Sequence, residues 1–127
     1  MKVKTLAWAI IGLAVVLLAG LFPYRSRTTY GGNFSLQDYQ MYIEEFPSEE
    51  IAGPVETEEM AIAVAERIWT SYYGNRVLFN KPYIVQFDAE NGAWLVRGSL
   101  PFYRAGGVPY ILIVEDSGRI LAVWHDK

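Results

Sequence analysis

The sequence predicts an α+β domain in which one main helix and a shorter amino-terminal helix pack on a four-strand antiparallel meander. Two observations predict this class: apolar residues recur at helical spacing before Gly74, and after Gly74 they follow a period of two in four short segments. The segments form two pairs with a short turn inside each, as in β-hairpins. We expect an apolar leader at residues 1–22, a tether at residues 23–34 and the folded domain at residues 35–127.

Residues 5–22 form an uncharged apolar run that follows Lys2 and Lys4. A helix of this length measures roughly 27 Å, which crosses a bilayer with local thinning. The run is longer than a usual signal-peptide core and no A-x-A-like site precedes Pro23, so we favour an uncleaved transmembrane anchor over a cleaved signal peptide. With a cytoplasmic amino terminus, the anchor places the domain on the extracytoplasmic side of the membrane.

Two helices are expected after the tether. Apolar residues at helical spacing from Leu36 to Phe46 predict a short helix that ends before Pro47. The main helix begins after Thr57, which can cap it, has two glutamates in its first turn, and stops at Gly74. Its broad apolar face consists of Ala61, Ile62, Ala65, Ile68, Trp69 and Tyr72.

The second half of the chain predicts two β-hairpins. Residues 81–88 and 93–99 flank an Asn-Gly turn, and residues 108–115 and 119–125 flank a turn that ends in Gly118. Because alternate residues of a strand share one face, each strand contributes a defined set to the core. The set expected beneath the main helix is Trp94, Val96, Ile111, Ile113, Ile120 and Trp124.

Gly106 and Gly107 precede the third predicted strand, which makes a phosphate-binding loop one interpretation. Such a loop needs glycines that lead into a helix amino terminus, often with a Lys and a Ser or Thr. Here the glycines lead into Val108, Pro109 and a β-rich run, which favours a turn or a bulge. Because proline lacks an N–H, Pro109 predicts a strand start or an edge strand.

The composition excludes several classes of function. The chain has no cysteine and one histidine, which removes disulfides and thiolate catalysis and argues against a Cys- or His-ligated metal site. A net charge of −3 disfavours a nucleic-acid partner.

His125 is the one histidine that can act as a general base, with Glu115, Asp116 or Asp126 as helper. It lies among the last three residues, and the adjacent Asp126 points the other way if the strand continues. No serine has the context of a nucleophile. We therefore favour a structural or solvated histidine and expect no enzyme activity, catalytic residue, cofactor or metal.

An acid-rich segment is the most distinctive charge feature. Nine acidic residues and no lysine or arginine lie from Asp38 to Glu66, which is compatible with a solvated surface or with a patch that docks a basic protein partner. Phe102 and Tyr103 lie beside Arg104 in a glycine-containing loop, where they suit an exposed binding rim. The candidate partner-binding residues are Glu44, Glu45, Glu49, Glu50, Phe102, Tyr103 and Arg104.

The carboxy-terminal half also carries a series of small motifs in a defined order. They are Glu59-x-Ala61 with Ala65, Tyr73-Gly74, Lys81-Pro82-Tyr83, Trp94-x-Val96-x-Gly98-x-Leu100-Pro101, Gly106-Gly107-Val108, Gly118-Arg119-Ile120 and His125. Over roughly residues 54–127 this series resembles the bacterial immunity proteins with a nuclear-transport-factor-two-like fold, which are associated with polymorphic toxin systems. The resemblance implies a truncated, cone-like version of that fold.

The resemblance also implies a non-enzymatic protein that binds and neutralises a cognate toxin. It supplies no catalytic residues, and the matched positions read mainly as scaffold: Gly74, Trp94, Gly98, Gly106, Gly107, Gly118 and His125. With the predicted anchor, the leading hypothesis is a membrane-tethered toxin antagonist. The alternatives are a small-molecule-binding or isomerase-like envelope protein of the same broad fold, which predicts an apolar pocket with convergent polar groups, and a structural or regulatory envelope module.

Overall fold

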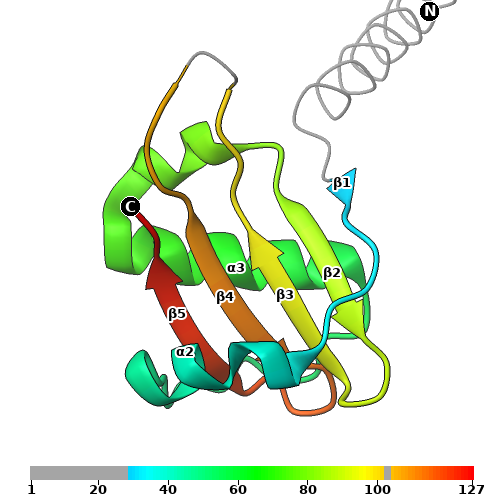
Figure 1. Cartoon of the computed structure of the whole chain (residues 1–127). Helices are drawn as coiled ribbons and strands as arrows, with labels where there is room; N and C mark the ends of the chain where they lie inside the picture. The colour runs from blue at the N-terminus through cyan, green and yellow to red at the C-terminus, as the bar shows by residue number, and fades with distance from the viewer. Residues whose placement is uncertain (1–28, 102–103) are drawn as a thin grey trace, which may run out of the picture.

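The computed structural model describes residues 29–101 and 104–127. Within these residues the chain forms one sheet with helices on both faces (Figure 1). The sheet order is β1-β2-β3-β4-β5, and the strands are β1 (Thr29–Tyr30), β2 (Ile84–Asp88), β3 (Ala93–Arg97), β4 (Pro109–Val114) and β5 (Ile120–His125). Strands β2 to β5 are antiparallel neighbours. The predicted α+β class and four-strand meander are therefore confirmed.

The fifth strand, β1, corrects the prediction of a tether at residues 23–34, because Thr29 and Tyr30 belong to the sheet. It pairs with β2 in parallel. The pairing extends to Gly31, whose N–H donates to the Val85 carbonyl at 2.8 Å. The Gln86 side chain also donates to the Gly31 carbonyl at 3.0 Å. A Cβ at residue 31 would overlap the side chains of Ile84 and Gln86, so glycine permits the close approach.

Helix α3 (Glu58–Tyr73) covers one face of the sheet and matches the predicted main helix. The Thr57 hydroxyl accepts a hydrogen bond from the Met60 N–H at 3.2 Å, as expected for an N-cap. Gly74 stops the helix with a φ of 76°, and the chain continues as the 3₁₀ helix η2 (Gly74–Asn80). The core between α3 and the sheet includes Ala61, Ala65, Ile68, Trp69, Val85, Trp94, Val96, Ile111, Ile113, Ile120 and Val123.

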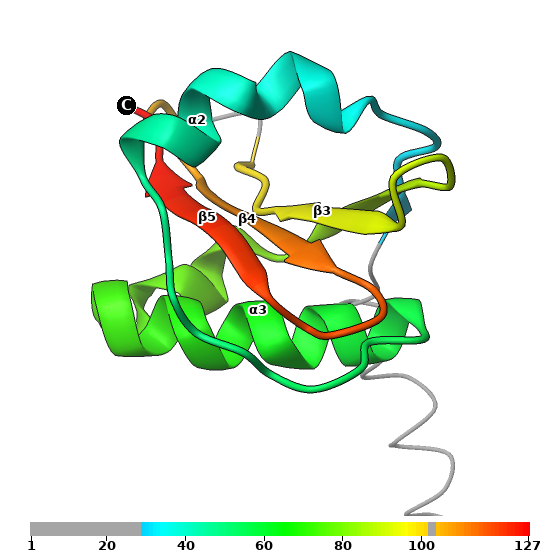
Figure 2. The same ribbon diagram turned by 90° about the horizontal axis from the view of Figure 1, so that it is seen from below.

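The predicted short amino-terminal helix forms as a 3₁₀ turn, η1 (Leu36–Tyr39), followed by α2 (Gln40–Glu45). Figure 2 shows that α2 lies on the side of the sheet opposite to α3. It packs with neighbouring residues over a second core of Leu95, Leu112, Ala122 and Trp124. Both faces of the sheet are consequently covered.

Trp124 lies on the face opposite to the one predicted. In the pairing of β4 with β5, Leu112 faces Ala122 but Ile113 faces Ile120, so Leu121 is an extra residue in β5. Such a bulge reverses the alternation of side chains beyond it. Ile120 therefore packs under α3 as expected, whereas Trp124 packs under α2.

The outer edge of β5 is covered by residues 46–55, which link α2 to α3. The Ile120 N–H donates to the Glu50 carbonyl at 2.9 Å, and the Val123 N–H donates to the Phe46 carbonyl at 3.2 Å. The buried Trp94 indole donates to the Val55 carbonyl at 2.9 Å. The linking segment thus protects a strand edge that would otherwise offer unpaired backbone groups.

The predicted membrane anchor at residues 5–22 lies outside the described residues, as does the tether up to residue 28. Among the helices that the structure describes, none has the length and apolar character needed to cross a bilayer.

Candidate functional site

An acidic surface lies on α2 and the segment that follows it. Its glutamates are Glu44, Glu45, Glu49 and Glu50, and all four are exposed. Large apolar side chains are exposed among them: Met41 is 75% exposed and Ile51 is 71% exposed. Exposed apolar groups next to charges of one sign are typical of a protein-binding surface. We refer to these glutamates, with Met41, Tyr42, Phe46 and Ile51, as the acidic surface.

The acidic surface is joined to the sheet by ring stacking and by backbone hydrogen bonds. The Tyr42 ring stacks on the buried Trp124 ring with centroids 4.5 Å apart, and Trp124 stacks on Tyr110 at 5.0 Å. Because the Phe46 and Glu50 carbonyls accept hydrogen bonds from β5, the backbone of the segment is fixed to the sheet, while its four glutamate side chains are exposed. A surface ordered in this way binds a partner with a smaller entropic cost than a mobile one.

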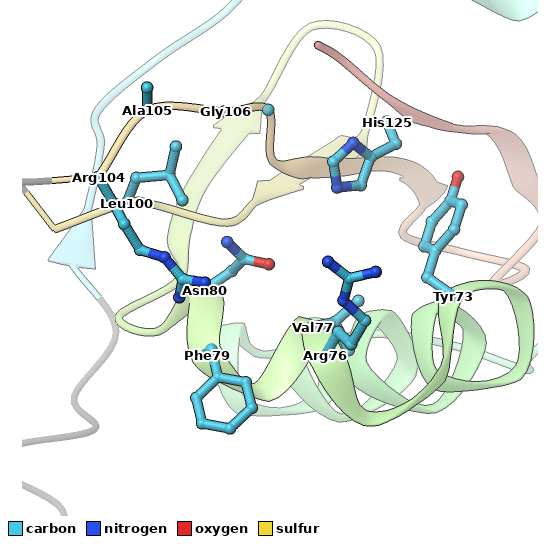
Figure 3. A pocket seen from close by; sticks show the side chains of 11 residues that line it. Tyr73, Arg76, Val77, Phe79, Asn80, Leu100, Arg104, Ala105, Gly106 and His125 are labelled. Atoms are coloured by element: carbon cyan, nitrogen blue, oxygen red, sulfur yellow. The ribbon is translucent and has the colours of Figure 1, made fainter.

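A separate pocket of about 400 Å³ opens where three segments meet. Figure 3 shows these segments: the end of α3 with η2, the connection between β3 and β4, and the end of β5. The lining residues are Tyr73, Arg76, Val77, Phe79, Asn80, Leu100, Arg104, Ala105, Gly106, Gly107 and His125. The pocket has two arginines and no acidic residue in its lining.

Local geometry explains how one wall of the pocket forms. The His125 ring lies against the Tyr73 ring with centroids 5.4 Å apart. His125 Nδ1 is 2.6 Å from the Asp126 main-chain carbonyl. The Asp126 carboxylate instead accepts hydrogen bonds from the Val108 N–H at 2.6 Å and the Tyr110 hydroxyl at 3.1 Å. His125 is thus placed on the pocket wall with no carboxylate bonded to its ring in the described structure.

The glycines of the β3–β4 connection form part of a connection into a strand, as predicted, and do not precede a helix. Gly106 and Gly107 lead into β4 and not into a helix, and Pro109 is the first residue of that strand. A Cβ at Gly107 would overlap the Asp126 backbone. The glycine therefore allows the connection to lie directly against the end of β5.

Two of the predicted scaffold glycines pack closely against neighbouring segments. The predicted partner-binding residues that the structure describes are divided between the acidic surface and the pocket. Gly98 and Gly118 are buried, and at each a Cβ would overlap a neighbouring segment. Arg104 lines the pocket, whereas none of the four glutamates of the acidic surface does. Phe102 and Tyr103 lie outside the described residues.

Sequence reasoning missed Arg76 and Asn80 as pocket residues. They follow the helix-stopping Gly74 in η2, where no periodic pattern indicates which way a side chain points. Burial raises the pKa of the neighbouring Tyr73 hydroxyl, with a smaller contribution from Tyr72. No group of three potential ligands among the described residues is placed to hold a metal ion.

The comparisons with known proteins agree with this architecture. Residues 60–127 match the family described as NTF2 fold immunity protein, and they include most of α3, η2 and strands β2 to β5. The chain therefore belongs to the NTF2 fold immunity protein family.

The chain is also similar to the uncharacterized protein YbbC of Escherichia coli (strain K12). The two are 33% identical over 112 residues, which cover 84% of this chain and 88% of that protein. No solved structure matches the chain.

Proposed function

We propose that this protein neutralises a cognate toxin of a polymorphic toxin system by binding it, without catalysing a reaction. Family membership supports toxin neutralisation. The acidic surface is the observation that carries the choice of binding site, because four exposed glutamates lie beside exposed apolar side chains on an ordered segment. A basic toxin would be attracted by the charges and anchored by the apolar groups.

The proposed location is the membrane, with residues 5–22 as an anchor and the domain on the extracytoplasmic side. The uncharged run supports a membrane span. Lys2 and Lys4 before the run are matched by Arg25 and Arg27 after it, so the cytoplasmic amino terminus is proposed and does not follow from the charges. A protein tethered there would protect the cell from a toxin that acts on the envelope, such as a cell-wall hydrolase or a membrane disruptor.

Growth rescue tests the function and the location together. The toxin encoded next to this protein is expressed in a host with the full chain, or with residues 24–127 either exported or retained in the cytoplasm. We expect rescue by the full chain and by the exported domain only. Failure of all three forms, with folded protein confirmed by circular dichroism, would contradict the proposed function.

Charge reversal tests the acidic surface. The paired variants Glu44→Lys with Glu45→Lys should weaken toxin binding by about tenfold or more, because attraction becomes repulsion. The matched control is Glu90→Lys with Asp116→Lys, which makes the same change in net charge. Both residues are also exposed but lie at hairpin turns. Equal affinities of the two variants in a calorimetric titration would exclude α2 as the docking site.

A further inference from the structure

The pocket beside η2 has an electrostatic character opposite to that of the whole protein. The chain has 14 acidic residues against 11 lysines and arginines, yet the pocket gathers Arg76, Arg104 and His125 with no acidic residue in its lining. Figure 3 shows the Arg76 guanidinium and the His125 ring facing one another across the hollow, with Arg104 extending beside Asn80. Two guanidinium groups in the lining of one hollow, with no acidic residue beside them, attract an anion.

The arginines of the pocket are not neutralised by carboxylates of the described structure. The ion pair recorded among the described residues joins Lys81 and Glu66, and neither residue lines the pocket. Asp126 is the acid adjacent to His125, but its carboxylate is occupied by the Val108 N–H and the Tyr110 hydroxyl. The guanidinium groups are therefore available to a ligand.

The polar groups of the pocket have defined hydrogen-bonding roles. A carbonyl oxygen can only accept, so the contact of His125 Nδ1 with the Asp126 carbonyl at 2.6 Å places a hydrogen on Nδ1 and leaves Nε2 for another partner. The Asn80 amide nitrogen donates to the Ser99 carbonyl at 3.3 Å. Its carbonyl oxygen then remains to accept a hydrogen bond from a bound hydroxyl or amide.

The remaining lining is apolar. Val77 and Leu100 contribute aliphatic surface, and Phe79, which is 71% exposed, contributes an aromatic rim. An exposed ring beside a hollow can cover the apolar part of a ligand. A volume of about 400 Å³ lies within the range of small-molecule sites, roughly 300–1,000 Å³.

We infer that this pocket binds a small organic anion, a carboxylate or a phosphate ester with an apolar portion. Arg76 and Arg104 bind the anionic group, because guanidinium forks match the oxygens of both chemistries. Phe79 and Leu100 contact the apolar portion. The site goes beyond toxin neutralisation and is distinct from the acidic surface.

The test uses the full-length chain in a nonionic detergent and three probes of similar shape: benzoate, phenyl phosphate and the neutral benzamide. Amide NMR spectra are recorded during each titration. We expect benzoate or phenyl phosphate to shift the signals of Gly106, Gly107 and His125 with saturation at millimolar concentration, and benzamide to shift them far less. Absence of saturable shifts with both anions, or equal shifts with benzamide, would overturn the proposal.

Substitutions establish which charges bind. Arg76→Gln and Arg104→Gln should each raise the dissociation constant of the better anion by about tenfold, the cost of a charge-assisted pair. All three arginines compared are exposed, so folding should persist, and Arg67→Gln on α3 is the control for the change in net charge. An effect of Arg67→Gln as large as that of the pocket variants would refute the assignment.

A short peptide that ends in phenylalanine distinguishes two sources of the anionic group, a small organic molecule and the carboxyl terminus of a protein. The peptide is titrated with a free carboxylate and with an amidated end. Binding of the free-acid peptide, combined with no binding of benzoate or phenyl phosphate, would assign the pocket to protein recognition and overturn the small-ligand proposal. Growth rescue by Arg76→Gln is expected to equal that of the unmodified chain, which separates this site from toxin neutralisation.

Discussion

Trp124 packs beneath α2 as part of the second core, and its replacement tests the bulge in β5. Trp124 stacks on Tyr42 at 4.5 Å and on Tyr110 at 5.0 Å. An aromatic pair contributes about 0.5–1.5 kcal/mol beyond the burial of area. Trp124→Leu should therefore lower the free energy of unfolding by about 1–3 kcal/mol from these two pairs alone, before any cavity is counted.

A double-mutant cycle isolates the contact with α2. Trp124→Leu and Tyr42→Leu are measured alone and together by urea unfolding of the full-length chain, and the coupling between them should be about 0.5–1.5 kcal/mol. Tyr72→Leu is the control, because Tyr72 lies on α3 at the opposite face of the sheet. The effects of Trp124→Leu and Tyr72→Leu on the free energy of unfolding should add to within about 0.5 kcal/mol.

The cycle discriminates between the two possible faces for Trp124. A coupling with Tyr42 no larger than the coupling with Tyr72 would show that Trp124 does not contact α2. It would refute the reversal of faces by the bulge and remove the structural support beneath the acidic surface.

Three further outcomes are expected from denaturation of the same chain. Trp94→Phe leaves the buried Val55 carbonyl without its indole donor and should lower the free energy of unfolding by about 1–3 kcal/mol; no change would mean that the carbonyl finds another donor. Hydrogen bonds, first from the Asn91 side chain and then from the Leu36 backbone N–H, lower the pKa of Asp88. Its ionised form therefore stabilises the fold above the unfolded-state pKa of about 4, and this stability is lost as pH falls through the lower folded-state pKa. Asp88→Asn should show a smaller loss of stability on acidification than the unmodified chain, and parallel pH profiles would contradict this. Gly118→Ala should destabilise the fold more than Gly92→Ala: both glycines have positive φ, but only at 118 would a Cβ overlap a backbone carbonyl. Equal effects would argue against that close packing.

The candidate site was only partly predictable from the sequence. The acid-rich segment was visible because charge is a property of composition, and Arg104 was singled out because it stands beside aromatics and glycines. The alternative hypothesis predicts a pocket, but its position and its residues could not be predicted, since Arg76, Arg104 and His125 are far apart in the chain. They meet only because η2, the β3–β4 connection and the end of β5 converge.

The sequence by itself determined the elements whose signals are local. Thr57 caps α3 and Gly74 stops it through hydrogen bonding and backbone freedom within one turn, and the Asn91-Gly92 turn joins β2 to β3. Only the tertiary structure decided the position of β1 and the face occupied by Trp124. A parallel pairing across more than fifty residues and a one-residue bulge depend on contacts between distant segments, which no local period records.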